Sequence, residues 1–378
     1  MRSIARALAS HGRHFKGWRT KEKIIGFSVD DYGAIRLSSR HGRDYLQKVL
    51  DKPLTARMDL FDALETRVDL EALYEVLRSV QDSCGRHAVF TAYVLSANPD
   101  IQAMRERGTY SVEDVRQSFQ QAESDQPSAY EGAWKLWNEG IELRLVKPQF
   151  HGREHVNAAL VQRLLDMQDP ILKANMDASC MAGLPSPAEM ANVGFTHSFG
   201  LHDESQLQRH RLIISDGIRR FQDIYGYQSR TFTPPAGQLH PSLDGYAFSE
   251  GLEILDKSFF SRRPVGHGKT KWELNFMTPP TQDRQGVIVR TVSFEPTSEG
   301  YADPVGHAIK EIERAFLWNQ PAIISSHRVN FAGHIEEKNR VRGLHALSEL
   351  LKRIIQRWPE VRFMAADEIF PVSHKAVA

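Results

Sequence analysis

The sequence predicts an α/β fold with a mainly parallel sheet or barrel. Short runs rich in β-branched and aromatic residues recur along the chain, and amphipathic helical stretches separate them, a pattern typical of strands joined by crossover helices. The length of 378 residues allows a large core, and α/β barrels of this size form as one unit. We therefore expect one domain over residues 23–370, with a basic N-terminal extension at 1–22 and a C-terminal tail at 371–378.

The expected strands and helices alternate along the chain. Strands are expected at residues 23–29, 87–95, 144–150, 193–199, 229–233, 252–260, 287–293, 321–326 and 361–364. Amphipathic helices are expected at 40–50, 68–83, 111–121, 156–167, 204–225, 242–250, 304–318 and 337–357. Segments 98–133 and 168–192 are polar or interrupted by proline, so we expect excursions that shape the mouth of a site, and we expect the basic segment 262–271 to be a loop.

The charge balance and the cysteine content of the chain limit the partners and the cellular compartment that we expect. Lys plus Arg is 48 against 47 Asp plus Glu, and this balance argues against nucleic acid or an anionic membrane as a partner. Cys84 and Cys180 belong to no Cys-x-x-Cys pair, so a disulfide framework or thiolate zinc site is not expected. No apolar run approaches the roughly 20 residues of a membrane span. We expect a cytoplasmic protein, with the basic residues 1–20 as a candidate contact with a membrane surface.

Ionisable residues follow three of the expected strands. Asp30 and Asp31 end the first apolar run, His151 begins a His-x-x-x-His pattern that ends at His155, and His327 follows a run near the C-terminus. Because the carboxyl ends of parallel strands gather at one face, these residues can converge. One carboxylate and two imidazoles can hold a divalent metal and leave a position open for water. A second carboxylate and a third histidine then remain for proton transfer.

Each motif also has a plainer structural interpretation. On a helical turn, His151 and His155 would share a face with Cβ atoms about 6 Å apart, but in a chain with 16 histidines the pair can also be a solvated helix start. Asp30 or Asp31 can cap a turn or the next helix. Two adjacent carboxylates, however, cannot both be buried cheaply as anions without a cation beside them. A metal supplies that cation.

These patches resemble motifs of the polysaccharide deacetylase family, also called carbohydrate esterase family four. Phe27 to Gly33 is similar to the family's first motif, and His151 to His155 to its second, with Gly152 in place of the usual hydroxyl residue. The resemblance extends over about residues 23–370 and implies a distorted (β/α) barrel of about seven parallel strands with loop insertions. It also implies Asp30 as general base, and Asp31, His151 and His155 as metal ligands.

Two further patches extend the resemblance. The segment from Arg230 to Gly237 is similar to the third motif, but Thr233 stands where the family has an arginine that orients the base. Arg230 and Arg328 are the candidates to replace it, and Pro235 and Gly237 are candidates for substrate contact. The segment ending at His327 is similar to the last motif, which implies His327 as general acid. The best match for the fourth motif's aspartate is Asp256.

The function expected from these residues is metal-dependent hydrolysis of an N-acetyl group on an amino sugar, as in a precursor of a surface polysaccharide. One divalent ion is expected, zinc on grounds of prevalence, although Co²⁺, Ni²⁺ or Fe²⁺ suit the same ligands. The partner is then an amino sugar or glycan, and the sequence indicates no oligomeric state. Two alternatives stay open: a hydrolase of a non-sugar amide such as a ureide or formamide, and a catalytically silent carbohydrate-binding relative, which Thr233 and Gly152 would favour.

Overall fold

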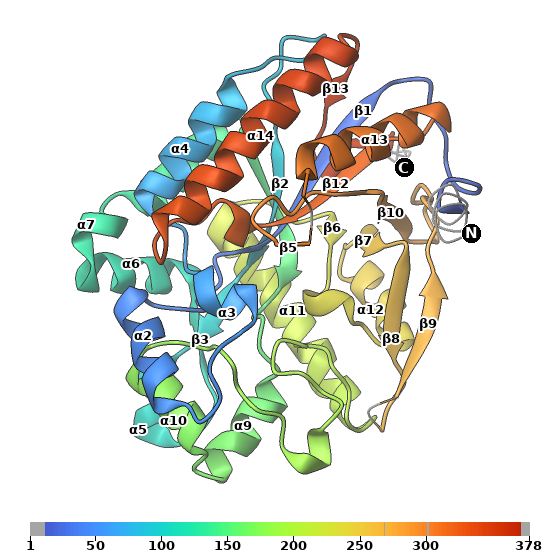
Figure 1. Cartoon of the computed structure of the whole chain (residues 1–378). Coiled ribbons are helices and arrows are strands. Elements are labelled where there is room, and N and C mark those ends of the chain that lie inside the picture. Colours follow the sequence, from blue (N-terminus) through green and yellow to red (C-terminus); the bar gives the residue numbers. More distant parts are fainter. Residues whose placement is uncertain (1–11, 268, 301, 372–378) are drawn as a thin grey trace.

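A nearly closed barrel of parallel strands forms the centre of the computed structural model, which describes residues 12–267, 269–300 and 302–371 (Figure 1). Eight strands follow one another around the sheet, and a ninth, β13, pairs with β1. In spatial order they are β10 (Gly286–Arg290), β7 (Ile254–Ser258), β6 (Thr231–Phe232), β5 (Val146–Gly152), β2 (Phe90–Leu95), β1 (Ile24–Tyr32), β12 (Ala322–His327) and β11 (Val292–Ser293), with β13 (Arg362–Phe363) beside β1. The two ends of this order, β10 and β11, are separated in the chain by Thr291 alone, so the sheet nearly closes on itself. The predicted α/β barrel is confirmed.

Helices cover the outside of the barrel (Figure 1). Those that match expected positions are α2 (Arg40–Val49), α4 (Arg67–Arg78), α6 (Val115–Asp125), α9 (Ala158–Asp166), α11 (Gln206–Tyr225), α12 (Asp244–Ser249), α13 (Pro304–Leu317) and α14 (Glu337–Arg357). The others are α3 (Arg57–Phe61), α5 (Ile101–Arg107), α7 (Pro127–Tyr130), α8 (Ala133–Glu142) and α10 (Pro170–Asp177). Capping signals set several starts: Thr66 and Asp69 form a capping box at α4, and Asp303 caps α13, whose first residue is Pro304.

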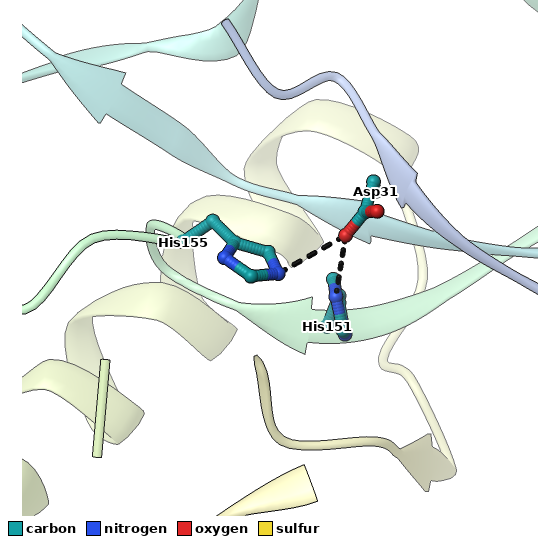
Figure 2. A group of neighbouring side chains, drawn as sticks. All are labelled: Asp31, His151 and His155. Atoms are coloured by element: carbon teal, nitrogen blue, oxygen red, sulfur yellow. Dashed lines mark hydrogen bonds and ion pairs between the residues drawn. The ribbon is translucent and has the colours of Figure 1, made fainter. Parts of the chain in front are cut away.

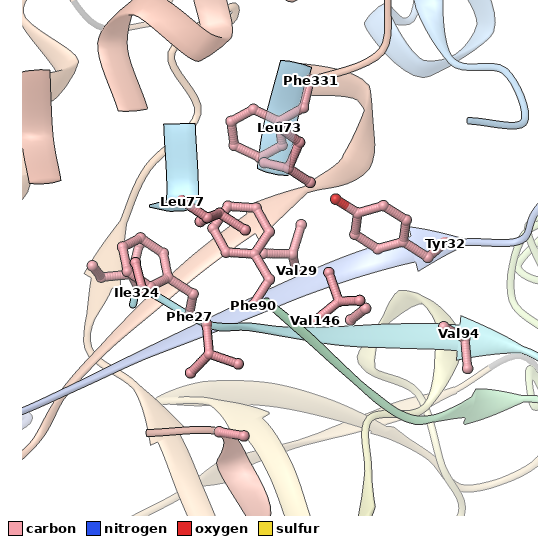
Figure 3. Packing of buried hydrophobic residues seen from close by; sticks show 14 of the residues in the cluster. Phe27, Val29, Tyr32, Leu73, Leu77, Phe90, Val94, Val146, Ile324 and Phe331 are labelled. Carbon is pink, nitrogen blue, oxygen red and sulfur yellow. The ribbon is translucent and has the colours of Figure 1, made fainter. Parts of the chain in front are cut away.

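The core lies between the strands and the helices outside them. Every residue of β1 is buried, as expected for a parallel strand covered on both faces. Figure 3 shows Phe27 and Phe90 from neighbouring strands beneath Leu73 and Leu77 of α4, and the two rings lie 5.2 Å apart between centroids. This packing holds the strands in register, and with them the residues at their carboxyl ends.

Several sequence expectations need correction. Residues 193–199 form a series of turns rather than a strand, because the backbone N–H groups of His197 and Gly200 bond to carbonyls three residues earlier. Segment 262–271 is not a plain loop but most of an antiparallel hairpin, β8 (Phe260–Pro264) with β9 (Thr270–Leu274). The excursion 98–133 contains α5, α6 and α7, and also β4 (Val112–Asp114), which pairs with β3 (Ala97–Pro99).

The two chain ends are only partly described. Residues 1–11 of the expected N-terminal extension, and 372–378 of the tail, lie outside the described residues. From residue 12 onward the extension packs on the barrel: His14 is buried against Gln320, and Trp18 contacts the ring of Phe370. No helix within the described part of the chain is both long and apolar enough to cross a membrane.

Candidate active site

The carboxyl ends of the strands border a cavity of about 610 Å³. Its lining includes Asp30 and Asp31 from β1, His151 from β5, Arg290 from β10 and His327 from β12. Strand register accounts for this convergence, since Asp30 lies directly opposite His327 in the pairing of β1 with β12. Residues far apart in the sequence are therefore neighbours because their strands end at the same level.

Three side chains form a compact cluster on one wall of the cavity (Figure 2). The Oδ1 atom of Asp31 lies 3.0 Å from Nε2 of His155 and 3.3 Å from Nε2 of His151. The three ligand atoms all lie within 4.8 Å of one another. Asp31 and His151 are buried and His155 is half-buried. The predicted ligand set is thus brought together by the fold.

The hydrogen bonding of His151 favours a metal at this place. Its Nδ1 lies 2.8 Å from the carbonyl oxygen of Thr233, which can only accept, so Nδ1 carries the proton. In the neutral ring, Nε2 then presents a lone pair toward the carboxylate of Asp31, and two acceptors face each other at 3.3 Å. A cation between them relieves this contact. A histidine oriented by a backbone carbonyl is also the usual arrangement at metal sites, so these residues fit a divalent ion.

An unusual backbone conformation lets two consecutive residues face the cavity. Successive side chains of a strand point to opposite sides, yet Asp30 and Asp31 both line the same space. Asp31 has a φ of 76°, in the left-handed region, and the pairing of β1 with β2 shifts register between Val29 and Tyr32. This bulge turns Asp31 toward the histidines while Asp30 keeps its direction in the strand.

The His-x-x-x-His segment does not form a helical turn as expected. His151 belongs to the end of β5, and His155 lies in the bend that follows, before α9 begins. Gly152 between them has a φ of 123°, and a Cβ at this position would lie 3.2 Å from the ring of Pro235. Only glycine tolerates this conformation readily, which explains why no hydroxyl residue stands here.

Asp30 is held by an arginine that the sequence analysis did not identify. Two nitrogens of Arg290 lie 2.6 and 2.7 Å from the two carboxylate oxygens of Asp30, and its Nε lies 2.8 Å from Oδ1 of Asp256. Burial alone would raise the pKa of Asp30, but the Arg290 guanidinium, with smaller contributions from His151 and His327, lowers it below the ordinary value. Asp256 also accepts a hydrogen bond from Ser28 at 2.5 Å. Asp30 is therefore fixed in orientation and kept ionised.

His327 on the opposite side is oriented by Glu295. Its Nδ1 lies 2.6 Å from Oε1 of Glu295, while Nε2 faces the cavity 3.9 Å from Oδ2 of Asp30. Burial disfavours the imidazolium, yet the carboxylates of Glu295, Asp31 and Asp30 together outweigh burial and raise the pKa of His327 to about 9, with Glu295 contributing most of the three. Glu295 is itself ion-paired with Arg57 and accepts a hydrogen bond from Asn330 at 2.7 Å. At neutral pH His327 therefore carries a proton on the nitrogen that faces the cavity.

The remaining predicted site residues fall in different places. Arg230 precedes β6 at the amino end of the barrel, where it binds Glu253 and the carbonyl of Asp367, so its assignment as a catalytic residue is wrong. Arg328 is buried beneath the site and bonds to Asp62 and Glu65 rather than to Asp30. Gly237 lines the cavity, whereas Pro235 packs under Gly152 and is not among the described residues that line it.

Arg290 and Glu295 are the site residues that sequence reasoning missed. The apolar run from 287 to 293 was interpreted as one strand, but it contains the end of β10 and the whole of β11, separated at Thr291. With that division, both residues obey the rule that identified Asp30 and His327, because Arg290 ends a strand and Glu295 follows the next one closely. The position of Arg290 at the end of a strand can therefore be recognised only when the boundary between β10 and β11 is known.

Comparisons with known proteins bear on the fold. No protein-family model matches the sequence, and no curated protein matches it. Among solved structures, Puue allantoinase is 11% identical with a TM-score of 0.44, and the match covers 93% of this chain and 90% of the allantoinase chain. A probable polysaccharide deacetylase from Pseudomonas aeruginosa PAO1 is 10% identical with a TM-score of 0.43, covering 92% and 89%.

A third solved structure differs in size. The 4-alpha-glucanotransferase from Thermococcus litoralis is 10% identical with a TM-score of 0.46, and the match covers 92% of this chain but 40% of the transferase. The chain is thus similar in structure to polysaccharide deacetylases and to other enzymes. At these identities and TM-scores the structural similarity does not indicate an activity for this chain. Its function is therefore inferred from the side chains of the cavity.

Proposed function

We propose that this protein is a metal-dependent hydrolase that removes the N-acetyl group from an amino sugar. One observation carries the proposal: a ligand set of Asp31, His151 and His155 lies in the same cavity as an ionised carboxylate, Asp30, and a protonated imidazole, His327. Hydrolysis of an amide needs a base for water and an acid for the departing nitrogen. Both are present beside the metal ligands.

Asp31, His151 and His155 would hold the metal. A divalent ion bound there supplies Lewis acidity, which makes water a stronger acid and a carbonyl a better electrophile. Nitrogen and carboxylate ligands suit zinc, and Co²⁺, Ni²⁺ or Fe²⁺ are compatible with the same set. Three protein ligands leave room in the coordination sphere for reactants.

Asp30 and His327, beside the metal ligands, accept and donate the protons of the reaction. Asp30, held by Arg290, accepts the proton of the attacking water as the carbonyl carbon is attacked. His327 donates the proton on Nε2 to the departing nitrogen, and Glu295 holds the Nδ1 side of the ring so that Nε2 faces the cavity. The products are acetate and a free amine, and no glycosidic bond is broken.

The contact between Arg290 and Asp30 also argues against a catalytically silent protein. Thr233 in place of the motif arginine is the main reason to expect inactivity, but Arg290 holds Asp30 from another strand and also donates a hydrogen bond to the hydroxyl of Thr233 at 3.3 Å. A small residue at position 233 leaves space for this guanidinium. We therefore favour an active hydrolase over a binding protein.

The test combines metal content with a substrate panel. Protein purified without added metal is subjected to elemental analysis and then assayed for release of acetate from N-acetylhexosamines, with small ureides and formamides as competing amides. We expect about one divalent ion per chain and acetate from an amino sugar, both lost in a His151→Ala/His155→Ala variant and kept in His345→Ala, an exposed histidine on α14.

Three results would redirect the proposal. Turnover of the ureides or formamides alone would favour the non-sugar amide hydrolase. Sugar binding without turnover, unchanged in Asp30→Asn, would favour the silent carbohydrate-binding protein. An absence of bound metal even after reconstitution would contradict the hydrolase altogether.

The cellular role is part of the proposal. We infer a cytoplasmic enzyme that acts on a precursor of a surface polysaccharide, since Cys84 and Cys180 are both free thiols, as is usual in a reducing compartment. Fractionation of the native host decides this point. Recovery of the protein from the medium or periplasm would remove the reason to expect a precursor.

A further inference from the structure

The hairpin of β8 and β9 presents one face to the cavity. Phe260 lies opposite Leu274, and Arg262 lies opposite Trp272, so these four side chains share one side of the two-stranded ribbon. Phe260, Trp272 and Leu274 are 58%, 60% and 53% exposed. Phe260, Arg262 and Trp272 also line the cavity that holds Asp30 and His327. The hairpin therefore extends the wall of the candidate active site outward as a partly aromatic surface.

Arg262 differs from the other cations of the cavity. Four Lys or Arg residues line it, and three are neutralised by carboxylates: Arg36 by Asp59 at 2.9 Å, Lys257 by Glu273 at 3.2 Å, and Arg290 by Asp30 at 2.6 Å. Within residues 12–267, 269–300 and 302–371, no carboxylate pairs with Arg262. Its positive charge thus remains available to a ligand.

The contact that Arg262 does make leaves its donors free. The guanidinium lies over the ring of Trp272, 4.6 Å from the centroid. A cation–π contact uses the flat face of the guanidinium, whereas the N–H donors point outward in its plane. Stacking therefore restricts the side chain without satisfying its hydrogen bonds. A guanidinium held in this way is preorganised to bind a carboxylate or phosphate with two parallel hydrogen bonds.

We propose that Arg262 is a specificity residue that binds an anionic group of the substrate, while Trp272 and Phe260 contact the apolar face of a sugar ring. The substrate is then an N-acetylated amino sugar that carries a carboxylate or a phosphate, rather than a neutral glycan. This inference rests on the proposed function, because it concerns the same cavity. The other Lys and Arg side chains of the cavity are paired with carboxylates, so Arg262 is where such a substrate gains affinity over a neutral one.

Product-like sugars test this inference independently of turnover, since they have no acetyl group to lose. Binding of glucosamine, glucosamine 1-phosphate and muramic acid to the metal-loaded protein is measured by calorimetry. The second sugar carries a phosphate and the third a carboxylate, so the comparison shows which anion the protein prefers. We expect at least one anionic sugar to bind about 10-fold tighter than glucosamine, as a charge-assisted pair provides. The preference should disappear in Arg262→Ala and weaken in Trp272→Ala.

Lys271→Ala is the matched control. Lys271 is an exposed cation on the same strand, it alternates with Trp272 and so points to the other face of the hairpin, and it is not among the residues that line the cavity. This variant should keep the full preference for the anionic sugar. A preference that survives in Arg262→Ala would place the anion elsewhere, as on the metal, and would overturn the inference.

Two parallel measurements separate the remaining outcomes. Release of acetate from neutral and anionic N-acetylated sugars with equal kcat/KM would leave the hydrolase intact and overturn the role of Arg262. Binding that depends on Arg262 without any acetate release would support the anion site and contradict only the hydrolysis. Light scattering on the wild type and on Trp272→Ala tests for a dimer. A wild type that is dimeric and a variant that is monomeric would show that the hairpin is a contact between copies of the chain, and the inference would be wrong.

Discussion

The guanidinium of Arg290 donates hydrogen bonds to both carboxylate oxygens of Asp30, at 2.6 and 2.7 Å, across a sequence separation of 260 residues. This two-point contact fixes the direction of the carboxylate as well as its charge. Asp30 adjoins Asp31 in the chain, but the two carboxylates have different partners: Asp30 is paired with Arg290, whereas Asp31 lies beside His151 and His155.

Replacing Arg290 by lysine tests the value of two-point binding. Lysine keeps the charge but cannot donate in parallel to both oxygens, so Asp30 loses its fixed direction. We expect kcat to fall by about 100-fold, with the acid limb of the kcat profile moved to higher pH because the pKa of Asp30 rises when its partner weakens. Steady-state kinetics on the preferred substrate measure both effects.

Arg230→Lys is the control for this prediction. Arg230 also binds a carboxylate through two nitrogens, at 3.0 and 2.7 Å from Glu253, but at the opposite end of the barrel. Its kcat should remain that of the wild type. Equal losses in the two variants would indicate a general effect on folding instead of a role for Arg290 at Asp30.

Replacing Glu295 by glutamine should move the alkaline limb of the pH profile. His327 acts as an acid only while protonated, and the wild type keeps it protonated up to about pH 9, with Glu295 the strongest of the carboxylates that raise its pKa. Without that carboxylate the pKa of His327 falls toward the ordinary value of about 6.5. Activity should then decline above about pH 6.5 rather than above about pH 9, with less change at lower pH. Glu253→Gln, remote from His327, should leave the alkaline limb in place.

Divalent metal should stabilise the folded chain. A ligand present at 100 times its Kd and bound only to the folded state adds about 2.7 kcal/mol to the free energy of unfolding. Chemical denaturation with and without zinc measures this gain. It should be absent in His151→Ala/His155→Ala and complete in His345→Ala; an equal gain in the double variant would locate the metal away from Asp31.

Arg328 should prove important for stability. It is 1% exposed and lies between two buried carboxylates, 2.9 Å from Asp62 and 2.8 Å from Glu65. Arg328→Ala leaves both acids buried without their partner, which we expect to cost about 3–5 kcal/mol in the free energy of unfolding. Arg353→Ala, which removes an exposed pair with Glu349 on α14, should cost less than about 1 kcal/mol. Similar losses in both variants would contradict the special role of burial.

Restoring the hydroxyl residue of the resembled motif should be harmful here. Gly152→Ser places a side chain at a φ of 123° and a Cβ 3.2 Å from Pro235. We expect a loss of about 1–3 kcal/mol in stability and weaker metal binding, because His151 is the preceding residue. Gly245→Ser, in open space on α12, is the control, with a change within about 0.5 kcal/mol. A serine variant with unchanged metal affinity would show that the turn can relax.

The sequence predicts the position of most cavity residues because one simple rule applies to them. Asp30, His151 and His327 each lie at the end of a segment that is long enough to be recognised as a strand, and parallel strands bring such ends together. The rule fails where a boundary is invisible. β11 has two residues and follows β10 after a single threonine, so Arg290 resembles the middle of a strand.

Backbone conformation is the other kind of information that the sequence conceals. The regular spacing of His151 and His155 suggested a helix, whereas the φ of 123° at Gly152 directs the chain into an extended turn. The alternating residues from 193 to 199 resembled a strand, but local hydrogen bonds of His197 and Gly200 fold them into turns. In both places the backbone conformation, and not the spacing of residue types, decides the structure.

The left-handed residue at Asp31 ties the chemistry of the cavity to the alignment of the sheet. β1 is bonded to β2 on one side and to β12 on the other, and the bulge that turns Asp31 exists only in that alignment. A slip of one residue would place either Asp31 opposite Arg290 or Asp30 beside the histidines, and a neighbour without a carboxylate, Tyr32 or Val29, would take the other position. With the metal site proposed above, ion uptake during refolding would report correct strand alignment, because a chain that has collapsed with β1 out of register would have the same residues without the cluster of Asp31, His151 and His155.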